Sequence, residues 1–364
     1  MIQISSNNIV VIGGTGNHHL DKSIIDWINN TVGTELYFVH IDFDEYPDEE
    51  ADFRFRKPEN IKGKIVIIFA SVYNDYLEKE LFDLIGASKH QYGALKIIVV
   101  LTFMRYRRQD HKDKPGEIDR NWLFLNNLKA CGADKLIVCD IHSEITLDNC
   151  RDLGIQAYNV SGAQIFADRI SPIVDILISD GYKFYIYSPD GGSINRAYNL
   201  AKILSAPVLL DLKERDHTGE VKIVRDEKRL EELRKKYNWE IYFADEELVN
   251  NAVICMIDDE LATGKTARMT GWHLRELGAK YLIYCATHAV CARGWKRMFI
   301  DNSPFNMNVF GNTIPRTYRD ETGGKITNVF MSKVIAQQLL KVIIWTEREL
   351  EKIKKFRRPK AKNQ

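Results

Sequence analysis

Short runs of β-branched and other apolar residues recur along the chain, and stretches with helical spacing separate many of them. The apolar runs lie at 9–14, 35–41, 64–71, 95–103, 135–141, 184–190, 206–212, 252–259 and 280–288. Amphipathic stretches lie between them, for example at 76–93, 120–133 and 268–279. Continuous apolar strands that alternate with helices indicate parallel sheets covered on both faces. The sequence therefore predicts an α/β fold whose mostly parallel sheets are flanked by helices.

Charged residues and a histidine follow several of these runs, where each predicted strand ends. Right-handed crossovers place the carboxyl ends of parallel strands on one side of a sheet, and α/β proteins bind ligands there. Core packing gives no reason for charges placed repeatedly after strands. We therefore expect a ligand site at these strand ends. The residues concerned are Asp140, His142, Asp190, Lys213, Arg215, Asp258 and Asp259.

The strand–helix pattern restarts near residue 165, which predicts two domains, 1–165 and 166–329. A helix at about 330–355 follows, and we expect it to pack back on the first domain. Residues 222–247 are highly charged with a helical middle. We interpret that segment as a surface insertion and assign no chemistry to it.

Charge and cysteine usage narrow the class of protein. The formal net charge of +1 provides no global field for a nucleic acid or a membrane surface. The 6 cysteines lack zinc-type spacing and several lie in apolar runs, which favours a reduced, intracellular protein. No apolar run approaches the roughly 18 residues of a membrane span, and the N-terminus lacks a signal-peptide pattern. We expect a soluble cytoplasmic protein that binds small molecules, with no nucleic acid and no membrane partner.

Residues 254–269, ICMIDDELATGKTARM, contain the Gly-Lys-Thr of an ATP-binding P-loop without its first glycine, whose position is occupied by Asp259. Two adjacent carboxylates suit a pair of sugar hydroxyls better than they suit a phosphate. A phosphate is better matched by what comes next in the chain: backbone N–H groups, threonine hydroxyls and a helix N-terminus near Ala267. Together these features predict a ribose 5-phosphate site. The residues expected in it are Asp258, Asp259, Thr263, Gly264, Lys265 and Thr266.

A second glycine-rich stretch, GGTGNHHL at 13–20, lacks the G-x-G-x-x-G of a dinucleotide site. We interpret it as a tight turn from a strand to a helix.

The apolar run followed by DDELATGKT resembles the ribose-phosphate loop of the type I phosphoribosyltransferase fold. Three further stretches narrow the resemblance to phosphoribosyl pyrophosphate synthetases: RYRRQDHK at 105–112, VCDIHSE at 138–144 and YSPDGGSINRAYNLAKIL at 187–204. Weaker matches are YPDEE at 46–50, KER at 213–215 and NTIP at 312–315. The resemblance covers nearly the whole chain in order, and it implies two phosphoribosyltransferase-like domains.

The resemblance also implies roles for individual residues. Arg108, Gln109 and His142 fall on positions that bind ATP in that family. His142 and Asp190 fall on positions that face the metal, and Asp190 also faces the ribose. ATP would be accompanied by Mg²⁺, which keeps most of its own waters when it bridges phosphates.

Two other matching segments concern the adenine and the transferred group. Tyr46, Asp48 and Glu50 fall on a loop that receives adenine from a neighbouring subunit, which implies a homo-oligomer with a shared active site. Lys213 and Arg215 repeat the Lys-x-Arg of the family's catalytic flexible loop. Cations there suit the charge on a transferring diphosphoryl group.

The implied reaction is the transfer of the β,γ-diphosphoryl group of ATP to the anomeric 1-hydroxyl of ribose 5-phosphate, with release of AMP. Such a reaction implies a role for the protein in nucleotide biosynthesis. The protein's contribution would be to position the reactants and neutralise charge.

The chain departs from the family within the 258–266 loop. The family carries a third acid and a second glycine where this chain has Ala262 and Lys265. Two explanations stay open: Lys265 points to solvent, or the acceptor is bulkier at its 5′ end, as in ADP-ribose. A non-catalytic regulatory subunit and a phosphoribosyltransferase are further alternatives. Retention of Lys213, Arg215, Arg108, His142 and Asp190 argues against the first. The segments RYRRQDHK and VCDIHSE argue against the second, which would not need them.

Overall fold

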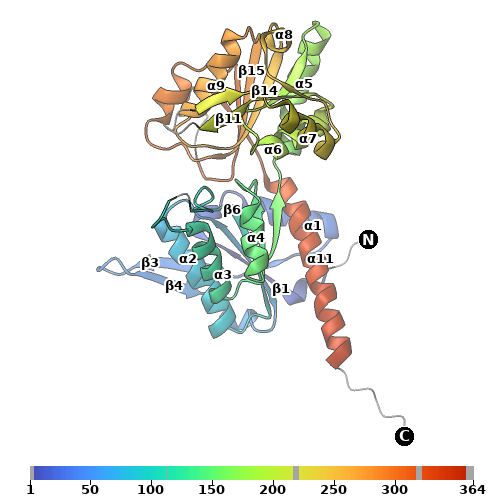
Figure 1. The fold of residues 1–364 in the computed structure, drawn as a ribbon. Helices are drawn as coiled ribbons and strands as arrows, with labels where there is room; N and C mark the ends of the chain where they lie inside the picture. The colour runs from blue at the N-terminus through green and yellow to red at the C-terminus, as the bar shows by residue number, and fades with distance from the viewer. Residues whose placement is uncertain (1–3, 113, 216–220, 317–321, 358–364) are drawn as a thin grey trace. The chain divides into compact units, whose positions relative to one another are not determined.

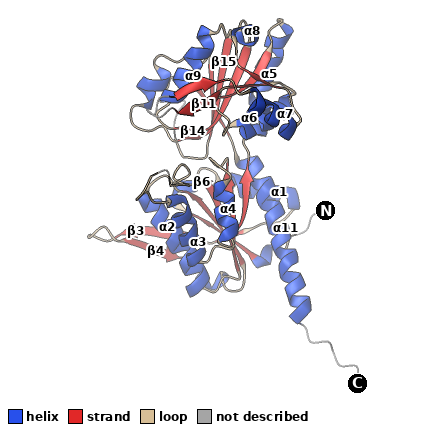
Figure 2. Cartoon of the chain, in the orientation of Figure 1, coloured by secondary structure: helices blue, strands red, loops and turns tan. Residues whose placement is uncertain are grey.

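A computed structural model of the chain describes residues 4–112, 114–215, 221–316 and 322–357. They form two compact units, each with a central parallel sheet (Figure 1). Unit 1 comprises the chain up to Cys139, then Glu144–Val160 and the chain from Ser332; unit 2 comprises Asp140–Ser143 and Ser161–Met331. Helices flank the sheet in both units (Figure 2), so the predicted α/β class is confirmed.

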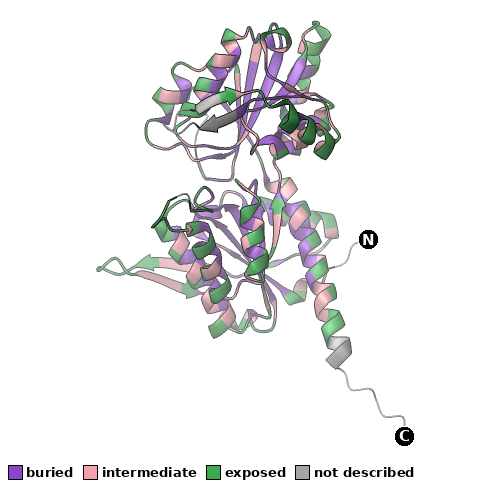
Figure 3. Cartoon of the chain, in the orientation of Figure 1, coloured by how far each residue is buried: buried purple, intermediate pink, exposed green. Residues whose placement is uncertain are grey.

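The sheet of unit 1 has 6 strands in the order β2-β1-β5-β6-β7-β8, and every pair is parallel. The strands are β1 (Ile9–Gly13), β2 (Tyr37–Phe38), β5 (Ile65–Ser71), β6 (Lys96–Phe103), β7 (Lys135–Cys139) and β8 (Gln156–Val160). The predicted apolar runs form the central strands, and β5 and β7 are buried along their whole length (Figure 3). Strands buried on both faces need such continuous apolar sequence.

Some helices of unit 1 begin at recognisable cap residues. They are α1 (Asp21–Val32), α2 (Asp75–Gly86), α3 (Arg120–Cys131), α4 (Ile145–Asp152) and α11 (Ser332–Arg357), with short helical turns at Ser6–Asn8, Thr15–Asn17, Pro58–Asn60 and Ala87–Gln91. The side chains of Asn74 and Asp119 accept hydrogen bonds from the first turns of α2 and α3. The 13–20 stretch forms a short turn between β1 and α1, as interpreted.

A two-stranded antiparallel hairpin, β3 (Ile41–Glu45) and β4 (Ala51–Phe55), extends from unit 1 (Figure 1). The rings of Phe43 and Phe53 pack edge to face at 5.2 Å between centroids. The predicted adenine loop, 46–50, is the exposed tip of this hairpin.

The C-terminal helix α11 follows unit 2 in sequence but packs on α1, β7 and β8 of unit 1. Trp345 lies against Tyr158 with ring centroids 5.7 Å apart. The ammonium of Lys135 donates to the carboxylate of Glu349 at 2.9 Å.

The sheet of unit 2 has 7 strands in the order β13-β10-β9-β14-β15-β16-β17, again with every pair parallel. The strands are β9 (Phe184–Ser188), β10 (Val208–Leu210), β13 (Ile241–Phe243), β14 (Val253–Leu261), β15 (Tyr281–Ala289), β16 (Met307–Gly311) and β17 (Ile326–Val329). Around it lie α5 (Ala163–Ser179), α6 (Ile194–Leu204), α7 (Glu227–Tyr237), α8 (Glu246–Val249), α9 (Lys265–Glu276) and a short helical turn at Lys296–Ile300.

The segment 222–247, expected to be a surface insertion, contributes to the sheet of unit 2. It contains most of β12 (Val221–Val224), which pairs with β11 (Leu212–Arg215), followed by α7 and β13. β13 pairs with β10 and forms the edge of the sheet. Leu230 of α7 is buried in the core between helices and sheet. The high charge of this segment reflects the exposed face of α7, while its apolar residues complete the fold.

Within the described residues, no helix has the length and apolar character needed to cross a membrane.

Candidate active site

The 258–266 segment runs from the end of β14 through a short loop into α9. The predicted order of strand, loop and helix is therefore present, although α9 begins at Lys265, two residues before the expected start. Gly264 has φ 77°, and a Cβ there would lie 2.6 Å from the Cβ of Phe299. Only glycine meets both conditions without strain, so Gly264 fixes the turn into the helix.

Asp258 and Asp259 lie side by side, and they differ in exposure. The side chain of Asp259 is 3% exposed and that of Asp258 is 29% exposed. The backbone N–H of Asp259 donates to Oδ1 of Asp258 at 2.9 Å, which fixes the rotamer of the outer carboxylate. The carboxylate of Asp258 is therefore the more accessible of the two, and that of Asp259 lies behind it.

His142 lies directly against the inner carboxylate. Its Nδ1 is 2.9 Å from Oδ2 of Asp259. Residues 140–143 follow β7 in sequence and belong with unit 2, so this contact lies within one unit. Sequence reasoning placed His142, Asp258 and Asp259 at strand ends; the structure brings the three together.

A largely buried arginine from α6 contacts the same acids. Nη1 of Arg196 is 3.9 Å from Asp258, and Nη2 is 3.7 Å from Asp259. Nη2 also donates to the backbone carbonyl of Ile141 at 3.3 Å. Sequence reasoning missed this residue, although its position at the start of the helix after SPDGGS was the available signal.

The buried side chain of Asp140 holds the 140–143 segment in place through hydrogen bonds. Its carboxylate accepts hydrogen bonds from the backbone N–H of Gly162 at 2.8 Å and from the hydroxyl of Thr287. Burial raises the pKa of Asp140, and the nearby Arg196 opposes that rise. A Cβ at position 162 would lie 3.0 Å from the Thr287 hydroxyl oxygen and 2.8 Å from Phe166, so glycine allows the close approach.

The acid pair has an unusual protonation equilibrium. Loss of hydration and the neighbouring Asp259 raise the pKa of Asp258 to about 7, and Arg196 opposes the rise. Burial and the same acids raise the pKa of the Tyr284 hydroxyl, which lies 3.5 Å from Oδ2 of Asp258. A carboxylate with raised proton affinity, as at Asp258, is well suited to accept hydrogen bonds from hydroxyl groups.

Asp190 lies in the loop between β9 and α6. Its Oδ1 accepts from the backbone N–H of Ser193 at 2.8 Å, and Ser188 donates to its carbonyl at 2.8 Å. The loop is thereby held in a defined conformation beside the helix that carries Arg196.

The other predicted site residues lie in different segments of the chain. Lys213 and Arg215 lie in β11, opposite Ile223 and Val221, and the structure describes their backbone but not their side chains. Arg108 and Gln109 are exposed in unit 1, just after an αL turn at Tyr106. The hairpin-tip residues Tyr46, Asp48 and Glu50 are exposed in the same unit.

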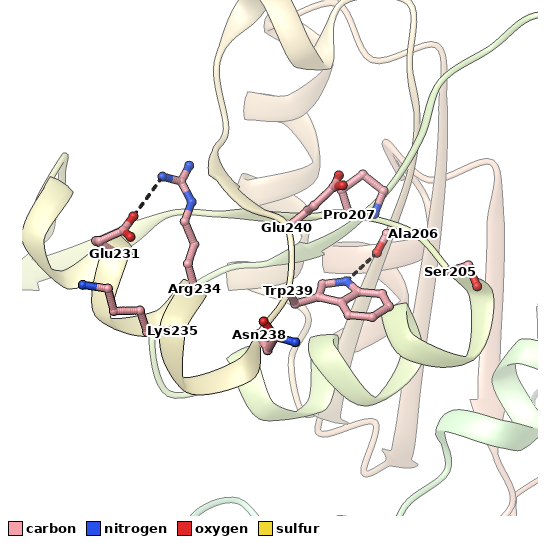
Figure 4. Close-up of a pocket in the computed structure, with 9 residues that line it drawn as sticks. All are labelled: Ser205, Ala206, Pro207, Glu231, Arg234, Lys235, Asn238, Trp239 and Glu240. Atoms are coloured by element: carbon pink, nitrogen blue, oxygen red, sulfur yellow. Dashed lines mark hydrogen bonds and ion pairs between the residues drawn. The ribbon is translucent and has the colours of Figure 1, made fainter.

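A separate hollow of about 600 Å³ lies at the other end of the unit 2 sheet (Figure 4). Its residues precede β10 and β13, at the amino ends of those strands. Trp239 donates to the carbonyl of Ala206 at 2.9 Å, and Arg234 pairs with Glu231 at 3.5 Å (Figure 4). The Trp239 bond links the chain after α7 to the chain after α6, and we assign no function to the hollow.

Comparisons with known proteins agree with the sequence motifs. The model of the N-terminal domain of ribose phosphate pyrophosphokinase matches residues 9–132. The ribose-phosphate pyrophosphokinase of Sulfolobus acidocaldarius is 26% identical over 91% of this chain and 100% of its own length. That of Sulfurisphaera tokodaii is 27% identical, with the same coverage of both chains.

The fold agrees as well. The crystal structure of phosphoribosylpyrophosphate synthetase from Mycobacterium smegmatis superposes with a TM-score of 0.71, covering 93% of this chain and 99% of the other. The two sequences are 20% identical, so this likeness concerns the fold. Motifs in order, a matching N-terminal domain and full-length relatives agree: along nearly its whole length the chain is similar to ribose-phosphate pyrophosphokinases, the phosphoribosyl pyrophosphate synthetases.

Proposed function

We propose that the chain transfers the β,γ-diphosphoryl group of ATP to the anomeric 1-hydroxyl of ribose 5-phosphate, with AMP as the leaving group. The observation that carries this proposal is the acid pair Asp258–Asp259 near the carboxyl end of β14, followed after a short loop by the N-terminus of α9. Acids accept from the ribose hydroxyls, and the N–H groups of the helix N-terminus hold the 5′-phosphate. Both requirements of the acceptor are met within a few residues.

The first turn of α9 supports a phosphate. Among the described side chains, none caps this helix through a hydrogen bond at Gly264, and the N–H of Lys265 makes a long contact of 3.4 Å with the Thr263 hydroxyl. Thr263, Lys265 and Thr266 are exposed. Their N–H and hydroxyl groups suit three phosphate oxygens.

We assign ATP to residues that the resemblance places on nucleotide-binding positions. His142 would approach a phosphate oxygen or a metal through Nε2, because its Nδ1 faces Asp259 at 2.9 Å. Arg108 and Gln109 of unit 1 would bind the nucleotide. Tyr46 would stack on the adenine of a neighbouring subunit in a homo-oligomer, with Asp48 and Glu50 accepting from its amino group.

Mg²⁺ fits this set of residues when ATP accompanies it. No group of three or more His, Cys, Asp or Glu side chains among the described residues would hold a metal alone. Mg²⁺ characteristically uses one or two protein ligands together with substrate phosphates. His142 and Asp190 would hold it, and when bound it neutralises phosphate charge. Lys213 and Arg215 would neutralise the oxygens of the transferring group, an interaction worth several kcal/mol in such reactions.

A bulkier acceptor, ADP-ribose, is a second candidate, favoured by cations beside the α9 N-terminus. Backbone hydrogen bonds from Cys291 to Leu261 at 2.9 Å and from Ala292 to Ala262 at 3.0 Å place the two segments side by side. Segments 262–269 and 291–300 carry basic residues and no acid. These basic residues are Lys265, Arg268, Arg293, Lys296 and Arg297. A diphosphate continues beyond the position of a monophosphate, where such cations can reach it.

The test is AMP release by the purified full chain from ATP and Mg²⁺, with ribose 5-phosphate or ADP-ribose as acceptor. Faster turnover with ribose 5-phosphate supports the first proposal, and preference for ADP-ribose supports the second. Absence of AMP with either acceptor would contradict catalysis and favour a non-catalytic associated subunit.

Lys265→Ala separates the two acceptors. If the lysine binds a second phosphate, the variant loses about tenfold in kcat/KM for ADP-ribose, because one exposed charge-assisted hydrogen bond contributes on the order of 1.4 kcal/mol. Its kcat/KM for ribose 5-phosphate would stay within about threefold. Lys280→Ala is the matched control, since Lys280 is an exposed lysine just before β15, at the opposite end of the same sheet. Equal losses for both acceptors would contradict a role for Lys265 in choosing between them.

A further inference from the structure

We infer that Arg196 is a positioning residue that holds the two acids of the acceptor site, and the segment carrying His142, in one fixed arrangement. This inference rests on the proposed function, because it gives Asp258 and Asp259 the task of binding the acceptor. Neither the family motifs named above nor the relatives' names assign a role to this arginine.

Geometry places Arg196 at the junction of three chain segments. Its side chain is 10% exposed and reaches from the first turn of α6. One terminal nitrogen is 3.9 Å from Asp258 of β14, and the other is 3.7 Å from Asp259 and 3.3 Å from the carbonyl of Ile141. A single guanidinium therefore ties α6, β14 and the 140–143 segment together.

The contacts with the acids are ion pairs rather than close hydrogen bonds, since they exceed normal donor–acceptor distances. The attraction is Coulombic, so Arg196 forms no close hydrogen bond with either carboxylate. The geometry thus lets Arg196 stabilise two neighbouring negative charges without occupying their binding positions.

Charge balance explains why a cation is needed here. The carboxylates of Asp259, Asp258, Asp140 and Asp190 all attract Arg196. His142 and the hydroxyls of Tyr284 and Thr287 face the same acids from other segments. Adjacent carboxylates repel each other in a site with little water, and without a cation one of them must move or take up a proton.

The helix that carries Arg196 is well suited to hold it still. Ala197, Leu200 and Ala201 of α6 are 0% exposed and belong to the core of unit 2. A planar guanidinium on a fixed helix keeps its two nitrogens at a set separation, which an ammonium cannot do.

The experiment compares Arg196→Met and Arg196→Lys in the full chain, with Arg169→Met as control. Arg169 is an exposed arginine on α5, the helix beside α6. We expect Arg196→Met to raise the KM for the acceptor by about 30-fold or more, since one partner of a buried charge pair is lost. The KM for ATP should change less than about threefold. Arg196→Lys should recover part of the loss because it keeps the charge but not the planar fork.

Two further measurements keep the inference separate from the proposed function. Binding of ribose 5-phosphate and ADP-ribose is measured by calorimetry, which needs no turnover. Crystal structures of the wild type and of Arg196→Met are then compared. We expect the carboxylates of Asp258 and Asp259 and the ring of His142 to shift by more than about 0.5 Å, the tolerance of a functional site.

The outcomes distinguish the two ideas. If the wild type binds an acceptor but releases no AMP, the proposed reaction fails and the binding data still decide the role of Arg196. If Arg196→Met keeps acceptor affinity within about threefold and leaves the three side chains in place, the inference is overturned, whatever the reaction. Equal losses in Arg169→Met would also overturn it, since they would indicate a general effect of removing arginine from unit 2.

Discussion

Both units have a glycine-containing loop between a buried strand and a helix, and the two loops use their polar groups in opposite ways. In unit 1, the loop after β1 closes on a buried acid: the N–H and hydroxyl of Thr15 donate to Glu80 at 2.6 and 2.5 Å. In unit 2, the loop after β14 leaves Thr263 and Lys265 exposed, with the acids behind it. Glycine and threonine alone therefore do not mark a phosphate site; what matters is whether the loop's donors are already used inside the fold.

The two units also differ in the role that we expect for a carboxylate near the end of a strand. Substituting one such acid in each unit should produce the largest difference in activity. We expect Asp259→Asn to lower kcat/KM for the acceptor by about 10³-fold, equivalent to about 4 kcal/mol, because a buried charge beside His142 and Arg196 is removed. Steady-state AMP release measures this.

Asp134→Asn is the matched change in unit 1. Asp134 pairs with Lys96 at 2.8 Å and Lys89 at 3.3 Å just before β7, at the amino end of the strand. We expect it to lower thermal stability while leaving kcat/KM within about threefold. Similar activity losses in both variants would remove the proposed contrast between a site acid and a structural acid.

The two units also contain a matched pair of glycines. Gly264 and Gly33 have φ of 77° and 68°, but a Cβ at position 33 meets no heavy atom within 4 Å. We expect Gly33→Ala to cost about 1 kcal/mol from backbone strain alone. Gly264→Ala should cost about 3 kcal/mol, because contact with Phe299 adds overpacking to the same strain.

Chemical denaturation of both variants tests the glycine pair. A difference below about 0.5 kcal/mol would mean that Phe299 moves aside and that the 264 position is constrained only by its backbone.

The sequence predicted the central strands well and the edges of the sheets poorly. The apolar runs correspond to β1, β5, β6, β9, β14 and β15, whose neighbours and covering helices demand continuous apolar residues. The parallel strands that were missed are β8, β13 and β17, which lie at sheet edges, and β16, which lies next to an edge strand; the edge strand β2 was predicted by the run at 35–41. An edge strand has one partner, so it tolerates the short, mixed sequence that gave no signal in 222–247.

The candidate site shows the same division between local and long-range information. Asp258, Asp259 and His142 were found because each follows an apolar run that forms a strand. Arg196 stands on a helix, where a single arginine resembles any surface cation, and Asp140 gains its partners from Gly162 and Thr287, which lie far away in sequence. Contacts between distant segments leave no local periodicity, so only the folded arrangement shows them.

The smallest expected effect concerns the buried acid of the unit 1 loop. Burial raises the pKa of Glu80 above its ordinary value of 4.5 despite the hydrogen bonds from Thr15. Above pH 4.5 the folded chain therefore binds more protons at this site than the unfolded chain, and the site's contribution to stability falls as pH rises through the folded pKa.

Glu80→Gln keeps an acceptor for the Thr15 N–H and does not titrate. The stability of the variant relative to the wild type should then improve between pH 4 and pH 8, by less than the glycine effects. Unfolding curves at several pH values measure that difference, with the exposed Glu232→Gln on α7 as control. A relative stability that stays flat or worsens with pH would show that Glu80 is held as a stabilised carboxylate, and the loop of unit 1 would then resemble the charged site of unit 2 more closely than its contacts indicate.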